Sequence, residues 1–371
     1  MNFVDKLLEE SSRRYGDKLA LSYRGIFKSE KFSYRELEDL SGKVAKRLMD
    51  DGYKADDKVL IWGENSPYWV IAYFGILRAG CVAVPVTAKS TKDIAQKYAK
   101  KTSAKAIIVS QLFVPNGSSF HRGVDVVHME DILVNLPTRG GSRARTNKDI
   151  AEIVFTSGTT GEPKGTVIRY GNIDVALDKI VPLAPKRGYV RMLSILPLSH
   201  IMEQVVGLML PLKIGASVYY IGRANTVSIK RALARYRITD MGVVPQVLRM
   251  FLDGVEFEVK RKNKEKVFTA ALKLAGFLPF SARRLLFASV HKNLGGSLEN
   301  FVVGSAPLDV SLAQTWERMG FRVIEGYGAS ETTAVVSANS EERRKLGYVG
   351  KPISGVDVRI HPKTKEILVK S

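Results

Sequence analysis

The sequence predicts an α/β fold built on parallel sheets, and three observations support this. Short apolar runs, typical of buried strands, recur along most of the chain. Helical stretches with amphipathic spacing separate most of these runs, as parallel sheets covered on both faces require. More than eight such runs occur, which indicates two sheets rather than one. The predicted strands are 59–62, 82–86, 106–109, 124–127, 153–155, 193–196, 218–221, 241–244 and 301–303.

Local signals fix where several helices begin and end. Ser33 and Glu36 have the spacing of a capping box, and the helix that follows ends at Gly52. Ser66 caps a second helix, with Pro67 in its first turn. Further helices are predicted over 201–214, 227–236 and 310–319. After about residue 337 the pattern changes, and residues 356–360 and 367–369 are predicted to pair as a hairpin.

Composition sets the broad class. At 371 residues the chain has room for two or three lobes, and 57 Lys and Arg against 37 Asp and Glu give a net charge of +20. One cysteine, Cys81, excludes a disulfide framework and a cysteine-rich zinc site. The sequence has no signal peptide and no apolar stretch long enough to span a bilayer, so we expect a cytoplasmic protein. Charge alone suggests nucleic acid, and no recognition motif supports it, so no nucleic-acid partner is predicted.

Two stretches are predicted to be loops. Residues 136–148 carry glycines and arginines with almost no apolar side chain, which favours a mobile basic linker. The second loop follows the predicted strand 153–155 and ends at Lys164 and Gly165. Its glycines let successive amides point inward, and its hydroxyls and lysine suit a polyphosphate. The residues concerned are Thr156, Ser157, Gly158, Thr159, Thr160 and Gly161.

This loop differs from a Walker A loop, because Pro163 precedes Lys164 and the Gly-Lys-Ser/Thr pattern is absent. Proline disfavours helix at the residue before it, so a loop is predicted rather than the start of a helix. A flexible surface turn is the alternative interpretation.

Five blocks in order make the chain similar to the adenylate-forming superfamily of acyl-CoA synthetases, peptide-synthetase adenylation domains and luciferases. They are residues 155–165, 196–200, 303–308, 325–333 and 348–352. Within that superfamily the chain most resembles the large N-terminal domain of a long-chain fatty acid–CoA ligase.

The resemblance implies a particular architecture. We expect two stacked αβαβα lobes with mostly parallel sheets, over residues 1–190 and 191–335, with packing of the N-terminal helices on the second lobe left open. Residues 336–371 are then the start of a small distorted β-barrel. The family's C-terminal lid domain is absent from the sequence, which implies poor turnover by this chain alone.

The resemblance also implies a reaction. A fatty acid carboxylate attacks the α-phosphate of ATP to give acyl-AMP and pyrophosphate, and coenzyme A then takes the acyl group. The protein is expected to be an AMP-forming acid–thiol ligase that uses ATP, Mg²⁺ and coenzyme A. Two alternatives stay open: a fatty acyl-AMP ligase, and a non-catalytic protein that binds nucleotide or lipid.

Three residues carry the implied chemistry. Lys164, with the loop before it, holds the β- and γ-phosphates, and Glu331 with Thr160 ligates Mg²⁺. His200 stands near the acyl carboxylate or the reacting phosphate. Each has a structural alternative: His200 as the cap of the next helix, and Glu331 as a solvated carboxylate at a helix start.

The remaining implied site residues surround the adenine. One side is lined by the loop that contains Ser305, which stands where the family usually has glycine. Tyr327 stacks on the other side unless it is a core aromatic, and the Ser330 hydroxyl reaches the α-phosphate. The set is Gly304, Ser305, Ala306, Pro307, Glu325, Gly326, Tyr327, Gly328 and Ser330.

A basic helical insertion is predicted over 254–298. Between residues 256 and 292 it holds nine Lys and Arg against three Glu. Gly276 and Pro279 divide it into two helices, with Ser281 as the cap of the second. A basic helix with an apolar face suits a membrane surface, and the alternative is a helix packed on the protein's own core. A homodimer is left open.

Overall fold

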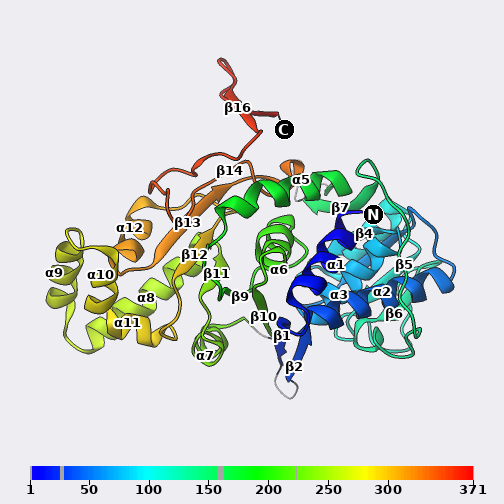
Figure 1. Ribbon diagram of the computed structural model, residues 1–371, viewed down its shortest axis with the longest axis horizontal. Helices are drawn as coiled ribbons and strands as arrows, with labels where there is room; N and C mark the ends of the chain where they lie inside the picture. The colour runs from blue at the N-terminus through cyan, green and yellow to red at the C-terminus, as the bar shows by residue number, and fades with distance from the viewer. Residues whose placement is uncertain (1, 26–28, 157–162, 223, 371) are drawn as a thin grey trace. The chain divides into compact units, whose positions relative to one another are not determined.

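The computed structural model describes residues 2–25, 29–156, 163–222 and 224–370. The chain forms two compact units (Figure 1). The first comprises Met1–Asp178 and Leu196–Gly222, and the second comprises Lys179–Ile195 and Arg223–Ser371. The chain thus returns to the first unit once after leaving it. The lobe boundaries expected at residues 190 and 335 stay predictions.

The first unit contains a six-stranded sheet in the order β6-β5-β3-β4-β7-β8. Every neighbouring pair is parallel except β7 and β8, which run antiparallel. One face of the sheet packs in a core that includes Leu60, Trp62, Val84, Ile107 and Phe120. The parallel sheet predicted from the apolar runs is therefore confirmed. The strands are β3 (Lys58–Trp62), β4 (Val82–Val86), β5 (Ala106–Val109), β6 (Asp125–His128), β7 (Ile150–Thr156) and β8 (Lys164–Arg169).

The helices of the first unit begin where the capping signals placed them. The Ser33 amide donates to Glu36 Oε2 at 2.7 Å and the Glu36 amide donates to Ser33 Oγ at 3.2 Å, so the capping box is formed. Ser66 Oγ accepts from the Trp69 amide at 3.2 Å. The helices are α1 (Phe3–Tyr15), α2 (Tyr34–Asp50), α3 (Pro67–Arg78), α4 (Lys92–Thr102) and α6 (Leu210–Lys213), while α5 (Tyr170–Ile180) leads into the second unit.

A strand pair in the first unit has no counterpart among the sequence predictions. β1 (Leu19–Arg24) pairs antiparallel with β2 (Ser29–Ser33) and parallel with β10 (Ser217–Ile221). β2 alternates exposed and half-buried residues over its first four positions and so lacks the apolar run that identified the buried strands.

Residues 136–148 are irregular, as predicted, but the prediction of a mobile linker is wrong. The Gly141 amide donates to the Gly42 carbonyl at 3.0 Å, and the Arg143 amide donates to the Arg78 carbonyl at 2.8 Å. Ser142 Oγ donates to Asp5, whose carboxylate also pairs with the buried Arg78 guanidinium at 2.9 Å. Backbone hydrogen bonds to α2 and α3 therefore hold the segment in place.

The second unit contains the strand order β15-β14-β13-β12-β11-β9. The four strands from β9 to β13 in this order are parallel, and β14 and β15 are antiparallel additions. The strand predicted at 193–196 lies earlier, at β9. The strands are β9 (Arg191–Leu193), β11 (Asp240–Val243), β12 (Asn300–Val303), β13 (Arg322–Tyr327), β14 (Ser337–Ala338) and β15 (Lys351–Pro352).

An aromatic cluster fixes α12 (Val310–Arg318) on this sheet. The rings of Phe301 and Trp316 meet edge to face at 5.0 Å, and those of Trp316 and Phe321 at 5.2 Å. All three side chains are fully buried. Burial of rings this large supplies much of the unit's hydrophobic stabilisation.

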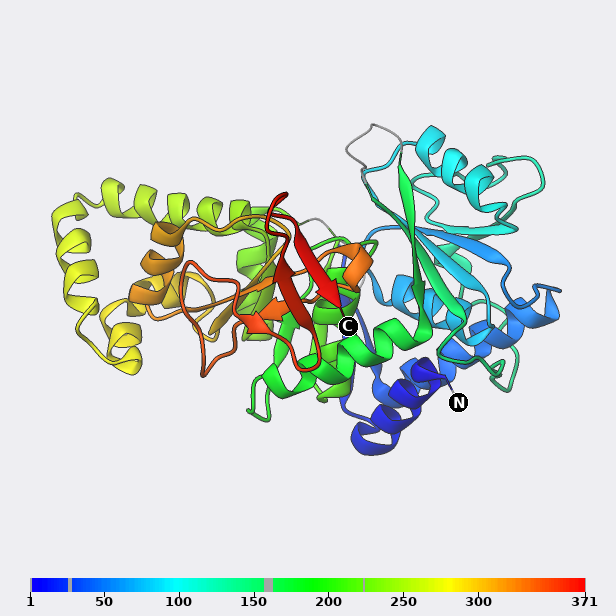
Figure 2. The same ribbon diagram turned by 90° about the horizontal axis from the view of Figure 1, so that it is seen from above.

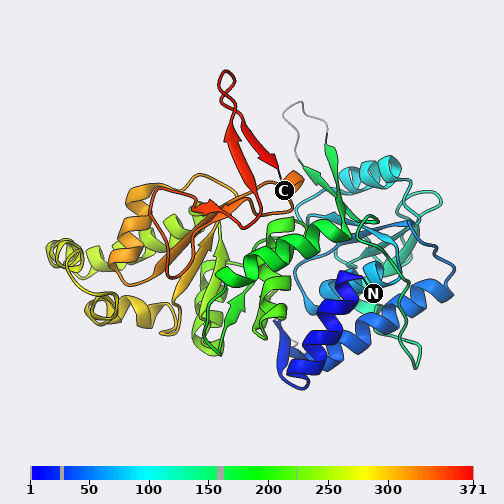
Figure 3. The same ribbon diagram turned by 45° about the horizontal axis from the view of Figure 1, so that its top comes forward.

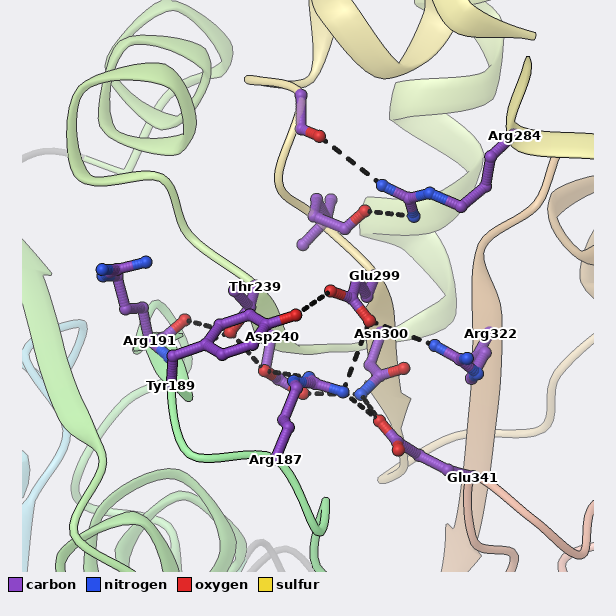
Figure 4. A network of polar contacts seen from close by, with 12 residues as sticks. Arg187, Tyr189, Arg191, Thr239, Asp240, Arg284, Glu299, Asn300, Arg322 and Glu341 are labelled. Carbon is purple, nitrogen blue, oxygen red and sulfur yellow. Dashed lines mark hydrogen bonds and ion pairs between the residues drawn. The ribbon is translucent and has the colours of Figure 1, made fainter. Parts of the chain in front are cut away.

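A polar network ties together the amino ends of these strands (Figure 4). Arg187 donates to the buried Asp240 carboxylate at 2.6 Å, and Asn300 donates to the same carboxylate at 2.7 Å. Arg187 also pairs with Glu299 at 3.5 Å and with Glu341. Because a buried carboxylate is costly unless it is paired, this network secures the edge of the sheet opposite to the carboxyl ends of the parallel strands.

Among the described residues, five helices lie between β10 and β12 in the sequence, and four of them follow one another between β11 and β12 (yellow-green to gold in Figure 2). The predicted break at Gly276 and Pro279 is confirmed. Ser281 is not the cap, because Pro279 occupies that position and no side chain caps the helix. The predicted second helix is split at Phe287. The helices are α7 (Thr226–Tyr236), α8 (Pro245–Arg261), α9 (Glu265–Ala275), α10 (Phe280–Leu286) and α11 (Ala288–Asn293).

The predicted C-terminal hairpin is confirmed. β16 (Asp357–Ile360) pairs antiparallel with β17 (Ile367–Lys370), with Val358 opposite Val369 (red in Figure 3). The strands after β13 form no closed barrel in the described part of the chain. No described helix combines the length and the apolar character needed to cross a bilayer.

Candidate functional site

The ends of the predicted phosphate loop lie side by side in the first unit. In the pairing of β7 and β8, Thr156 is opposite Lys164 and Phe155 is opposite Gly165. The chain continues from the loop into a strand, so the prediction that Pro163 prevents a helix start is confirmed. Lys164 is exposed and Thr156 is half-buried. Ser157, Gly158, Thr159, Thr160 and Gly161 lie outside the described residues.

Packing holds the base of this loop. The Phe155 ring stacks on Tyr98 of α4, with centroids 3.9 Å apart and planes 9° from parallel. A Cβ at Gly165 would lie 2.9 Å from the Ile153 side chain, which explains glycine at that position. Lys101 Nζ donates to the Pro163 carbonyl at 3.2 Å. A rigid base of this kind presents Lys164 in a fixed place.

Two amide side chains hold residues 196–200, which we call the 196–200 turn. Asn65 Nδ2 donates to the Leu196 carbonyl at 2.6 Å, and the Leu198 amide donates to Asn65 Oδ1 at 2.9 Å. Gln204 Nε2 donates to the Leu198 carbonyl at 2.9 Å. Neither amide residue was singled out from the sequence, because nothing local marks a side chain that bonds to a distant backbone.

His200 ends this turn and starts the next helix through its backbone. Its carbonyl accepts from the amides of Glu203 and Gln204 at 3.0 and 3.2 Å. The residue is exposed, yet partial burial of the ring and then the charge of Lys89 lower the pKa of His200. The imidazole is therefore neutral at physiological pH and can accept a hydrogen bond at one nitrogen and donate from the other.

The helix after His200 opens with a wide π turn. This turn is η3 (Glu203–Met209), and it leads into α6. Pro211 has no N–H to donate to the carbonyl of Gly207, which favours a change of helical register there. Such turns are frequent at functional sites, and Pro211 is the sequence signal that could have found this one.

In the second unit the predicted adenine-side residues leave one edge of the sheet. Val303, at the end of β12, is in register with Glu325 of the parallel strand β13. The segment that begins at Gly304 and the one that ends in Ser330 therefore start from neighbouring strands at their carboxyl ends. Ligands of open α/β sheets bind at such edges.

Ser305 adopts a backbone conformation that favours glycine. Its φ is +67°, in the left-handed region where a Cβ is strained. Glycine, which has no Cβ, would adopt this conformation without strain. Ser305 is exposed, Ala306 is half-buried and Pro307 is exposed, so all three can face a ligand.

Glu325 and Tyr327 lie on the same strand but in different surroundings. Glu325 is buried, and desolvation raises the pKa of its carboxyl group. Tyr327 is 37% exposed, so it is not the core aromatic of the alternative interpretation. A carboxyl group and an exposed ring are suited to the edge and the face of a base respectively.

Glu331 lies on a tight turn. It belongs to η4 (Ser330–Thr332), a single turn in which Thr332 Oγ1 accepts from the Ala329 amide at 3.0 Å. Its carboxylate is exposed, and the three-residue turn removes the basis for a long-helix dipole role. A Cβ at Gly328 would lie 1.8 Å from the Ala334 carbonyl oxygen, so glycine is required there.

The side chains described at this edge are compatible with Mg²⁺. In the described part of the chain no three His, Cys, Asp or Glu side chains gather as a complete metal site. Mg²⁺ is usually bound by one or two carboxylates together with substrate phosphates and water. One exposed carboxylate, Glu331, therefore suffices on the protein's side.

These features define an α/β protein with mostly parallel sheets. This is the fold of the N-terminal domain of adenylate-forming enzymes. A family model described as AMP-binding enzyme matches residues 8–369. The chain belongs to this family.

Curated relatives with related names match the chain at low sequence identity. The chain is 23% identical to the rat long-chain-fatty-acid–CoA ligase ACSBG2, over 98% of its own length and 62% of the relative's. It is 22% identical to the Arabidopsis thaliana chloroplastic long-chain-fatty-acid–[acyl-carrier-protein] ligase AEE15, over 98% and 60%. The chain thus spans about three fifths of these curated relatives. The inhibitor-bound N-terminal domain of FACL13 from Mycobacterium tuberculosis superimposes with a TM-score of 0.79 at 18% identity, over 99% and 86%.

Proposed function

We propose that this chain is the N-terminal part of an AMP-forming acid–thiol ligase that activates a long-chain fatty acid with ATP and passes it to coenzyme A. The observation that carries the proposal is the shared edge of β12 and β13, where Ser305, Glu325 and Tyr327 lie together. The family match and the names of the relatives support the reaction class.

In the first step a carboxylate oxygen forms a bond to the α-phosphorus of ATP, and the bond to pyrophosphate breaks. No nucleophile from the protein is needed, so catalysis consists of positioning two anions and neutralising charge. Lys164 would offset the charge of the β- and γ-phosphates. Neutral His200 would donate a hydrogen bond to an oxygen of the acyl carboxylate or the reacting phosphate. Holding His200 neutral avoids trapping the carboxylate as an ion pair.

The nucleotide itself would be held by the second unit. Tyr327 would stack on the adenine, opposite the loop of Gly304, Ser305, Ala306 and Pro307. The Glu325 carboxyl would meet the edge of the adenine, and the Ser330 hydroxyl would reach the α-phosphate. Glu331 with Thr160 would hold Mg²⁺, which supplies charge neutralisation at the phosphates when bound.

The second step transfers the acyl group from AMP to the coenzyme A thiol. A fatty acyl-AMP ligase, which stops at the adenylate or serves a carrier protein, is the nearest alternative, and one relative is an acyl-carrier-protein ligase. Product analysis of the intact enzyme with and without coenzyme A separates the two. A non-catalytic binding protein is distinguished by the absence of pyrophosphate release from that enzyme.

For this chain the direct test is binding of a hydrolysis-resistant palmitoyl-adenylate analogue, followed by thermal unfolding. A ligand at a hundred times its Kd stabilises the native state by about 2.7 kcal/mol. We expect an upward shift of Tm that Tyr327→Ala abolishes, while Tyr348→Ala, a change at another exposed tyrosine of the same unit, preserves it. An equal shift in both variants contradicts the proposed adenine site.

We also propose that α8, α9 and α10 contact an anionic membrane surface. On these helices Phe257, Val267 and Leu285 are 65%, 66% and 79% exposed, and Phe277, between α9 and α10, is 90% exposed. Apolar side chains this exposed do not pack on the protein's own core, the alternative use of a basic amphipathic helix. The nine Lys and Arg of residues 256–292 supply attraction to anionic head groups.

Co-sedimentation with vesicles tests this surface. We expect binding to phosphatidylserine-containing vesicles, weaker binding to neutral ones, and loss of binding in Phe277→Glu with Leu285→Glu. Leu112→Glu, at a residue 75% exposed in the first unit, is the matched control and should bind normally. Binding unaffected by the double change refutes this surface. A homodimer stays a prediction. Light scattering tests it by comparing the mass in solution with the chain mass of 41.1 kDa.

A further inference from the structure

A buried polar cluster lies inside the first unit. Glu152 is in the middle of β7, in register with Ala83 of β4 and Ile168 of β8. Its side chain is fully buried, as are those of Tyr73 on α3 and Gln204 on η3. Three elements therefore place polar groups in an otherwise apolar interior, which is costly unless the groups satisfy one another.

Contacts run through this cluster to the 196–200 turn. The Tyr73 hydroxyl donates to Gln204 Oε1 at 3.2 Å, and Gln204 Nε2 donates to the Leu198 carbonyl at 2.9 Å. Both Tyr73 and Gln204 interact with the Glu152 carboxyl group. Neither carboxyl oxygen has a partner at standard hydrogen-bond geometry in the described part of the chain, so these last contacts fall outside that geometry.

Burial opposes ionisation of the cluster near neutral pH. Burial raises the pKa of Glu152 to about 8, only partly opposed by Gln204 and Tyr73, and burial also raises the pKa of Tyr73. A protonated carboxyl group can donate to an amide or hydroxyl oxygen, which an ionised one cannot. The three side chains can therefore form one neutral hydrogen-bonding unit.

We propose that Glu152, Tyr73 and Gln204 form a positioning cluster that couples the strand entering the phosphate loop to the 196–200 turn. Glu152 is four residues before Thr156 on the same strand, and Gln204 is one helical turn after His200. Displacing either end of the cluster thus moves a residue proposed to meet the phosphates or the acyl carboxylate. The proposal rests on the proposed function, because it assigns these residues to that site.

The test compares two tyrosines. Tyr73→Phe and Tyr170→Phe each remove one buried hydroxyl from the first unit, but Tyr170 donates to the Leu77 carbonyl, and among the described residues no hydrogen bond joins it to Gln204 or to the 196–200 turn. We expect Tyr73→Phe and Gln204→Met to weaken binding of the palmitoyl-adenylate analogue by about tenfold, since small misplacements at a site are amplified. Tyr170→Phe should bind within about twofold of the unchanged chain at a comparable loss of stability.

A second readout keeps this proposal separate from the proposed function. The pKa of His200, followed by NMR titration without ligand, should shift in Gln204→Met and Tyr73→Phe and stay constant in Tyr170→Phe. If the unchanged chain does not bind the analogue but His200 responds as expected, the proposed function fails and the coupling stands. If His200 titrates identically in all variants, or all bind the analogue equally, the positioning cluster is refuted.

Discussion

Replacing Glu152 by glutamine should change how the stability of the first unit depends on pH. Glutamine has nearly the same shape as a protonated glutamate and cannot ionise, so Glu152→Gln keeps the neutral hydrogen bonding of the cluster. The comparison between the two chains then isolates the ionisation of one buried group.

The sign follows from the direction of the pKa shift. The pKa of Glu152 rises from an ordinary value of 4.5 to about 8 in the folded chain. The unfolded chain therefore loses this proton from about pH 4.5 upward, while the folded chain retains it until about pH 8. The stabilising contribution is present below pH 4.5 and is lost progressively up to pH 8.

The magnitude follows from the same shift. One pKa unit corresponds to about 1.4 kcal/mol, so the group costs the folded chain on the order of 4–5 kcal/mol across the whole window. The groups that face it do not titrate in this range: Tyr73 has a raised pKa, Gln204 has none, and Ala83 and Ile168 are its strand neighbours. The free energy of unfolding of Glu152→Gln, relative to that of the unchanged chain, should thus increase by about 3–4 kcal/mol between pH 5 and pH 8.

Urea denaturation at pH 5, 6, 7 and 8 measures this difference. Trp62 and Trp69 report the first unit by fluorescence, and a Trp316→Phe background removes the signal from the second. Glu9→Gln, at an exposed carboxyl of α1, is the control and should run parallel to the unchanged chain. A constant difference between Glu152→Gln and the unchanged chain at all four pH values refutes the burial argument.

Three further predictions concern the second unit. Ser305→Gly should raise the free energy of unfolding by about 1 kcal/mol by relieving the left-handed backbone strain, whereas Ser305→Ala should not; thermal melts of both variants check this. Arg187→Met should lower the free energy of unfolding by about 3–5 kcal/mol in denaturant titrations, because it leaves the buried Asp240 without its cation, and a near-neutral result would mean that Asp240 is protonated. Gly328→Ala should weaken Mg²⁺-ATP binding by displacing the turn of Glu331, measured by calorimetry, and unchanged affinity would show that the backbone adjusts freely.

Much of the fold could be predicted because its signals are local. Ser33 and Ser66 mark helix starts through bonds to residues three positions away, and most buried strands contain a run of apolar residues. The prediction failed where the deciding contacts are distant in sequence. Residues 136–148 look like a linker, yet backbone carbonyls of Gly42 and Arg78 hold them. Serine is a common N-cap residue, but the N-cap position of α10 is occupied by Pro279 and not by Ser281.

The candidate site divides in the same way. Lys164 and Glu331 lie in ordered blocks of sequence, so they could be proposed from the sequence alone. Asn65, Gln204 and Tyr73 could not, because their roles depend on helices and strands that meet only in the folded unit. For Glu152 one signal was available in the sequence: a carboxylate lies inside an otherwise apolar strand. A residue of this kind needs a physical explanation.

The central proposal is that Lys164 and Glu331 each take part in binding Mg²⁺-ATP, and calorimetric titration of Mg²⁺-ATP into the unchanged chain, Lys164→Ala and Glu331→Ala tests it most directly. The account predicts one ATP per chain, an affinity reduced at least about tenfold by either change, and a dependence on Mg²⁺ that is lost in Glu331→Ala, since each removes a charge that opposes the phosphates. Undiminished ATP affinity in either variant would contradict it.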